Sequence, residues 1–214
     1  MVRTRFDKQM AELNDEIVAM GWLCKQAIDK VSEALCSGDV QVAAQVREID
    51  ERIDAKEGDI ESLCLKMLLQ QQPVARDLRQ ISAALKMITD MERIGDQAED
   101  VAEIVGYLGS RTTDEHVHIR DMAQATSGMV TAAANAYVAQ DATLARAVID
   151  FDDTVDGFFI QVKDSLVAMI AENPDDGLFA LDLLMIAKYF ERIGDHATNI
   201  AEWVLFSITG EHVE

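Results

Sequence analysis

One pentapeptide occurs twice in the chain. Residues 92–96 read Glu-Arg-Ile-Gly-Asp, and residues 191–195 repeat them at an offset of 99 residues, from 92 to 191. A looser match pairs residues 46–54 with residues 148–156 at an offset of 102 residues, from 46 to 148. Repetition at one long period is the sequence signature of duplicated structural units. We therefore predict a tandem duplication, in which two copies share one fold.

The apolar residues of both copies follow a helical period. They recur at steps of three and four almost throughout, which indicates amphipathic helices. A softer break near Gln140 is followed by Asp141, which is placed to cap the next helix as Asp39 does. Clearer breaks, each containing Gly or Pro, fall at residues 37–39, 72–73, 109–114 and 173–177.

Five breaks divide the chain into six long helices. Helices of such length pack side by side in antiparallel bundles. The predicted fold class is therefore all-α, with two tandem pseudo-symmetric three-helix bundles, residues 1–109 and residues 110–214. The expected helices are residues 4–36, 40–71 and 74–108 in the first copy, and residues 114–139, 142–172 and 175–208 in the second.

Composition supports this class and narrows the partners. The 214 residues are 49% hydrophobic and include only 2 Pro, which suits long helices around a substantial core. The net charge of −20 repels nucleic acid and the anionic inner leaflet of a membrane, and it concentrates cations. Acidity that serves solubility alone is the alternative explanation.

The cysteines and the hydropathy place the chain in the cytoplasm. The spacing of Cys24, Cys36 and Cys64 fits neither a disulfide framework nor a zinc site, so we expect buried, reduced thiols. No stretch approaches 18 uncharged apolar residues, so we expect no direct membrane insertion.

The two copies can be compared with each other to find residues that a shared role requires. Positions that only face solvent drift apart after a duplication, whereas residues with a common role are retained. The acidic residues that differ between the copies are Glu57, Glu61, Asp90, Glu99 and Asp100. The retained acidic residues are Asp50, Asp54, Glu92, Asp96 and Glu103 in the first copy, and Asp152, Asp156, Glu191, Asp195 and Glu202 in the second.

The retained carboxylates come in pairs on one helix face. A spacing of i and i+4 places both members of each pair side by side, where like charges repel. On the third helix of the first copy, the apolar line through Leu85 and Ile88 continues into Glu92 and Asp96. We therefore predict a metal site of several carboxylates in each bundle, suited to Mg, Mn or Fe rather than Zn. A solvated acidic face, with Arg93 and Arg192 pairing with neighbouring acids, is the alternative.

The glycine inside each pentapeptide is costly in a helix. Gly95 and Gly194 each lower helix stability by about 1 kcal/mol relative to Ala. Its retention in both copies indicates close approach, by a neighbouring helix rather than by an ion.

Several segments resemble the signature of the PhoU family. They are residues 72–79 (Gln-Pro-Val-Ala-Arg-Asp-Leu-Arg), residues 85–86 and residues 90–96, with residues 191–200 matching half of the signature. The opening Phe6-Asp7 and Met20-Gly21 are also similar, so the resemblance covers essentially the whole chain. In the first copy, Gln97 stands where the second has His196, and Asp100 stands where it has Asn199.

The resemblance implies a regulator and not an enzyme. Members of this family are expected to form homodimers. They are expected to act as negative regulators that link the ATPase subunit of a phosphate ABC transporter to a sensor histidine kinase. The resemblance also implies metal clusters, of iron or another divalent cation, on Asp50, Asp54, Glu92, Asp96, Asp152, Asp156, Glu191 and Asp195. Additional candidate ligands are Asp100, Glu103, Asn199 and Glu202.

Two other functions remain open at this point. A di-metal carboxylate enzyme of a helical bundle needs Glu-x-x-His motifs, and one match exists, Glu115 with His118. A bundle that binds partner helices without metal is the second alternative.

Overall fold

The computed structural model describes residues 2–71, 73, 75–108, 111–112 and 118–212. These residues form α-helices and one short 3-10 turn, Pro174–Asp176, with no strand among them. The all-α prediction is confirmed. The helices are α1 (Val2–Ser37), α2 (Val40–Gln71), α3 (Arg76–Leu108), α4 (Ile119–Ala139), α5 (Ala142–Glu172) and α6 (Gly177–Thr209).

The predicted helix bounds agree with these within a few residues at most ends. The predicted starts at residues 74 and 114 lie outside the described residues, as does the predicted boundary between the copies at residues 109 and 110. The last helix begins at Gly177, later than predicted, because residues 174–176 form the 3-10 turn that follows Asn173.

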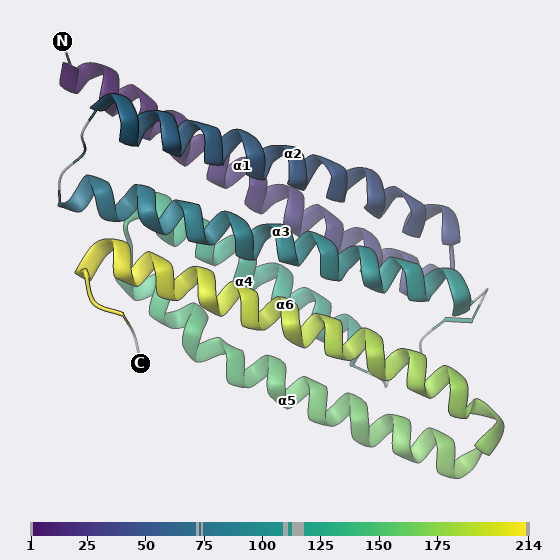
Figure 1. Cartoon of the computed structure of the whole chain (residues 1–214). Coiled ribbons are helices and arrows are strands. Elements are labelled where there is room, and N and C mark those ends of the chain that lie inside the picture. The colour runs from purple at the N-terminus through teal and green to yellow at the C-terminus, as the bar shows by residue number, and fades with distance from the viewer. Residues whose placement is uncertain (1, 72, 74, 109–110, 113–117, 213–214) are drawn as a thin grey trace.

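The helices form two layers (Figure 1). In the front layer α3 lies against α6, and α2 and α5 flank them on either side. Behind this layer, α1 packs against α2 and α3, and α4 packs against α5 and α6. Each copy thus supplies three helices that contact one another, as predicted. The copies also contact each other through α3 with α6 and through α1 with α4, so they share one core.

The short connections repeat between the copies. Gly38 and Gln140 have left-handed backbones, with φ of 67° and 51°, and each is followed by an aspartate. Asp39 accepts a hydrogen bond from Gln41 N at 2.8 Å, and Asp141 accepts one from Thr143 N at 2.9 Å. The predicted capping roles of both aspartates are confirmed.

The thiols are reduced, but they are not all buried. Cys24 and Cys64 are buried, whereas Cys36 is half-buried at the end of α1. The expectation of burial is therefore wrong for Cys36, because that residue lies at the helix end, where α1 leaves the core. Within the described part of the chain, no helix is long and apolar enough to cross a membrane.

Candidate functional site

An acidic cluster lies between α2 and α3. It contains Asp50, Asp54 and Glu57 of α2 and Glu92, Asp96 and Glu99 of α3, and we call it the first cluster. Burial and the charges of neighbouring members raise the pKa of Asp50, Glu57 and Glu92. Burial raises the pKa of Glu92, and the charges of Asp96 and Glu57 raise it further. The acidic pairs of α2 and α3 therefore lie within electrostatic range of one another.

Asp50 is the most perturbed member of the first cluster. Its side chain is only 6% exposed, and burial, followed by the charges of Asp54, Glu99 and Asp96, raises its pKa to about 7. Glu99 is thus a neighbouring acidic group that favours the protonated form of Asp50. Its Oδ1 atom is buried and has no hydrogen-bond partner. A buried oxygen of this kind is costly unless a proton or a cation satisfies it.

Gly95 makes room for the Asp50 carboxylate. A Cβ atom at residue 95 would lie 2.4 Å from Asp50 Oδ1 and 3.0 Å from Ile53 Cδ1, both on α2. The predicted close approach of a neighbouring helix is therefore confirmed. At Gly194 the same atom would meet Val155 Cγ1 at 3.3 Å and Asp152 Oδ1 at 3.5 Å, so the second copy is less tight.

A second cluster lies between α5 and α6. It contains Asp152 and Asp156 of α5 and Glu191 and Asp195 of α6. Burial raises the pKa of Asp195, and the charges of Glu191, Asp152 and Asp156 add to this effect. Burial and the charge of Asp156 likewise raise the pKa of Asp152. In both copies, four of the five retained carboxylates therefore lie on neighbouring helices, within electrostatic range of one another.

Nearby polar groups compensate the second cluster more than the first. Lys188 donates hydrogen bonds to both carboxylate oxygens of Glu191, and it lowers the pKa of Asp195. The hydroxyl of Thr198 lowers the pKa of Asp152 in part, against the larger effect of burial. The counterpart of Lys188 in the first copy is Thr89, a neutral residue whose hydroxyl lies 3.4 Å from Glu57 Oε1.

The cations around the first cluster are more distant and more exposed. Arg93 Nε lies 3.7 Å from Glu92 Oε2, and the Arg93 side chain is 60% exposed. Arg47 Nε lies 3.8 Å from Glu99 Oε1, with its side chain 74% exposed. Ion pairs this exposed contribute under about 1 kcal/mol, so they do not offset the burial of Asp50.

The donor set of both clusters fits a hard divalent cation. All the donors are carboxylate oxygens, and in the first cluster one buried oxygen lacks a partner. As the side chains stand, no three His, Cys, Asp or Glu residues among those described converge closely enough to hold a metal ion. Binding would therefore require side-chain rotations that bring the facing pairs together.

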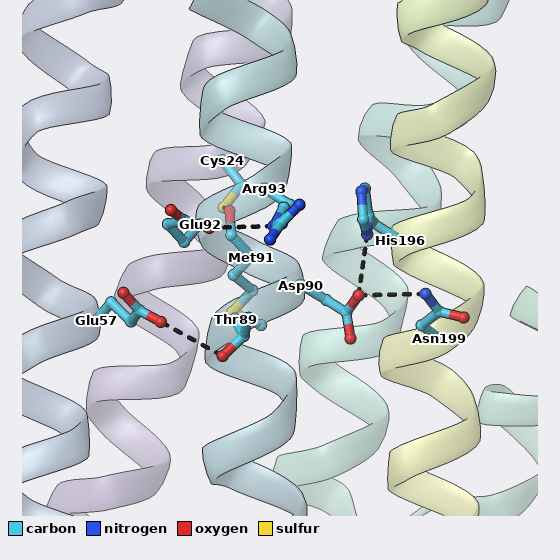
Figure 2. A network of polar contacts seen from close by, with 9 residues as sticks. All are labelled: Cys24, Glu57, Thr89, Asp90, Met91, Glu92, Arg93, His196 and Asn199. Carbon is cyan, nitrogen blue, oxygen red and sulfur yellow. Dashed lines mark hydrogen bonds and ion pairs between the residues drawn. The ribbon is translucent and has the colours of Figure 1, made fainter.

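The additional candidate ligands have other partners. Asn199 Nδ2 donates to Asp90 Oδ1 at 3.2 Å, and His196 Nδ1 lies 2.9 Å from the same oxygen (Figure 2). Burial raises the pKa of Asp100, and a hydrogen bond from Tyr189 offsets part of that rise. These contacts cross from α3 to α6, away from the two clusters.

The remaining two candidates also lie outside the facing pairs. Tyr107 OH donates to Glu103 Oε1 at 3.0 Å, within a groove of about 560 Å³ between the start of α2 and the end of α3. Burial raises the pKa of Glu202, and Asp90 is the neighbouring charge that raises it further.

Comparison of the copies missed two members of the first cluster. Glu57 was set aside because its counterpart is Phe159, and Glu99 because its counterpart is Thr198. Yet both lie close to the retained carboxylates, because the charge of Glu57 raises the pKa of Glu92 and the charge of Glu99 raises that of Asp50. Comparison of the copies cannot find such residues, since an acidic side chain can join the cluster of one copy alone.

The motif for a di-metal enzyme has no support in the described residues. Glu115 lies outside them, and His118 Nδ1 pairs with Asp121 Oδ2 at 2.9 Å on α4, remote in sequence from both clusters.

Comparison with known proteins gives consistent matches. The sequence profile of the PhoU domain matches residues 17–105 and 119–204. A "Phosphate-specific transport system accessory protein PhoU homolog" from Pseudomonas aeruginosa is 34% identical over 214 residues, which cover 99% of this chain and 88% of that protein. The homolog of the same name from Aquifex aeolicus is 36% identical and covers 97% of this chain and 94% of its own length.

Solved structures show the same fold. The crystal structure of PhoU from Pseudomonas aeruginosa has a TM-score of 0.89 at 34% identity, and covers 96% of this chain and 100% of that one. The phosphate transport system regulatory protein PhoU from Streptococcus pneumoniae has a TM-score of 0.87 at 24% identity, covering 98% of this chain and 99% of its own.

Proposed function

The chain belongs to the PhoU family, and on that basis we propose that it is a regulatory accessory protein of phosphate transport. It acts by binding other proteins and not by catalysis, in keeping with relatives that are named as accessory proteins of a transport system. It restrains phosphate uptake and phosphate-responsive signalling when phosphate is plentiful.

The observation that carries this proposal is the pair of facing acidic clusters. Structural needs alone do not explain them, because a buried Asp50 oxygen without a partner lowers stability in the absence of a cation. Their presence in both copies adds weight, because each copy keeps its acidic pairs between the same two helices.

Divalent metal ions occupy the clusters in the functional protein. Asp50, Asp54, Glu92 and Asp96 would hold them in the first cluster, and Asp152, Asp156, Glu191 and Asp195 in the second. A bound cation would supply the positive charge that makes the convergence of four carboxylates favourable. Iron, manganese and magnesium suit an all-oxygen donor set, and zinc suits it less well.

The partners are the ATPase subunit of a phosphate ABC transporter and a sensor histidine kinase. Both would be met in the cytoplasm, where the protein works as a homodimer. The net charge of −20 favours basic protein surfaces over nucleic acid and anionic lipid.

A reporter of phosphate-responsive transcription tests the proposal in cells that lack the endogenous gene. We expect the wild-type chain to repress the reporter at high phosphate, and Asp50→Asn with Glu92→Gln to weaken that repression. Co-purification with the tagged ATPase subunit and with the kinase, at high and low phosphate, identifies the direct partner. A wild-type chain that neither represses the reporter nor binds either protein would refute the proposal.

A further inference from the structure

Five large apolar side chains are exposed on α5 and α6 near the turn that joins these helices. They are between 48% and 74% exposed. We call them the apolar patch: Ile160, Val167, Leu178, Leu181 and Met185.

Helical spacing aligns the members of the patch along each helix. Ile160 and Val167 are seven residues apart on α5, and Leu178, Leu181 and Met185 follow steps of three and four on α6. The α6 line continues to Lys188, whose Nζ lies 5.7 Å from the centroid of the Phe159 ring on α5, so this line borders α5.

The first copy provides an internal control for the patch. At the 99-residue offset, the counterparts of the three α6 members are, in order, Arg79, Ser82 and Lys86, all polar. At the 102-residue offset, the two α5 members correspond to Gly58 and to Leu65, which is itself 47% exposed. The same helix pair therefore folds with polar residues along its second helix. Contiguous exposed apolar side chains that the fold does not require mark an interaction site.

The patch continues into the second cluster. Asp156 lies one helical turn before Ile160 on α5, and on α6 the line from Leu181 passes Lys188 and reaches Glu191. The exposed amine of Lys188 is already paired with Glu191. A segment lying along the α5–α6 face would thus meet apolar side chains at one end and carboxylates at the other.

Electrostatics selects among the occupants that could cover this face. Anionic lipid is negative, so the charge of −20 repels it. Asp156, at the end of the face beside the second cluster, favours positive charge on the occupant, whereas Lys163, between Ile160 and Val167, does not.

We propose that the α5–α6 face binds an amphipathic segment of a partner protein. Its apolar residues lie on the patch and, when the second cluster is free of metal, the Lys or Arg residues at one end lie over that cluster. This inference rests on the proposed function, in which the chain acts by binding partners, and it locates that binding on the second copy.

The test uses the full chain in EDTA and a fluorescent synthetic peptide of about 16 residues, the length of an amphipathic helix that fills a groove. The peptide carries Leu at i, i+3 and i+7, followed by four lysines, and a matched peptide carries four glutamates instead. By fluorescence anisotropy, we expect the lysine peptide to bind at least about tenfold more tightly than the glutamate peptide.

The decisive variant carries Leu178→Arg, Leu181→Ser and Met185→Lys, which are the residues of the first copy at the same positions. We expect it to keep the wild-type melting temperature and to bind the lysine peptide at least about tenfold more weakly. Leu69→Ala is the matched control, since Leu69 is 83% exposed near the opposite turn, and it should bind as wild type does.

Four outcomes would overturn this inference, three of them in solution and one on vesicles. The three in solution are equal binding by wild type and the triple variant, no binding of the lysine peptide to wild type, and loss of a homodimer in the triple variant by sedimentation. Binding of the wild-type chain to anionic vesicles that the triple variant lacks would overturn it too. None of these results would touch the reporter assay, so failure of this inference is distinguishable from failure of the proposed function.

Discussion

Replacing Asp50 by Asn should stabilise the metal-free protein at alkaline pH. The carboxyl group has an ordinary pKa of 3.8, and burial with three neighbouring carboxylates raises it to about 7 in the folded chain. Between these values the folded state retains a proton that the unfolded state has released. Stability from this group is therefore complete below about pH 4 and is lost as the pH rises through 7.

The size of the effect follows from the two pKa values. At 1.36 kcal/mol per pH unit, the difference between 3.8 and about 7 corresponds to about 4 kcal/mol. Relaxation of the neighbouring side chains and screening by water and salt reduce this to about 2 kcal/mol. Asn keeps the shape and is neutral at every pH. The variant should therefore be more stable than wild type by about 2 kcal/mol at pH 8, and by less than half of that at pH 5.

Urea unfolding followed by circular dichroism in EDTA, at pH 5, 6, 7 and 8, measures the difference in unfolding free energy between the variant and wild type at each pH. The sequence pI of about 4.4 makes pH 5 the practical lower limit, because solubility falls near the pI. For a chain of this size, 2 kcal/mol corresponds to a rise in melting temperature of about 4 to 8 °C. Asp59→Asn, an exposed carboxylate on the same helix, is the control. An equal advantage of Asp50→Asn at pH 5 and pH 8, or none at pH 8, would refute the reasoning.

Other substitutions test the contacts around the clusters. Gly95→Ala should destabilise the protein by about 1 to 3 kcal/mol, because its Cβ would lie 2.4 Å from Asp50 Oδ1. Gly194→Ala should change stability by less than about 1 kcal/mol, because the added Cβ would lie 3.3 Å from its nearest neighbour and Ala favours the helix. Thermal melts in which Gly194→Ala is the more destabilised of the two variants would contradict this. Lys188→Ala should tighten Mn²⁺ binding at the second cluster several-fold, because the amine of Lys188 neutralises Glu191 in the wild-type chain. Unchanged or weaker binding by calorimetry would count against this prediction.

The sequence predicted most of the fold because the duplication and the helical period are both strong local patterns. The capping aspartates, Asp39 and Asp141, lie where predicted, since a short polar side chain before a helix satisfies its free N–H groups. The facing of the acidic pairs followed from i and i+4 spacing beside an apolar stripe.

The seam between α3 and α6 could not be predicted in the same way. Comparison of counterpart positions does not reveal this seam. Asp90 pairs with His196 and Asn199, whose counterparts in the first copy are Gln97 and Asp100. Asp100 in turn contacts Tyr189; these two residues are the counterparts of Asn199 and Asp90. The two contacts therefore join the same two positions, with the copies exchanged. Contacts of this kind depend on how the copies dock, which local patterns do not contain.

The degree of burial of Asp50 could not be predicted from the sequence either. Helical spacing placed it beside the apolar stripe, but its exposure of 6% depends on the approach of α3 at Gly95. Three-dimensional contacts therefore decide which of the duplicated aspartates is most perturbed.

Equilibrium binding of Mn²⁺ to the chelator-stripped protein tests the central claim most directly. Titration at pH 8, with free Mn²⁺ followed by electron paramagnetic resonance, should show saturable sites of two classes. Asp50→Asn with Glu92→Gln should abolish one class, and Asp152→Asn with Glu191→Gln should abolish the other. Saturable binding that both double variants retain in full, or no saturable binding by wild type, would contradict the assignment of the facing carboxylates as metal sites.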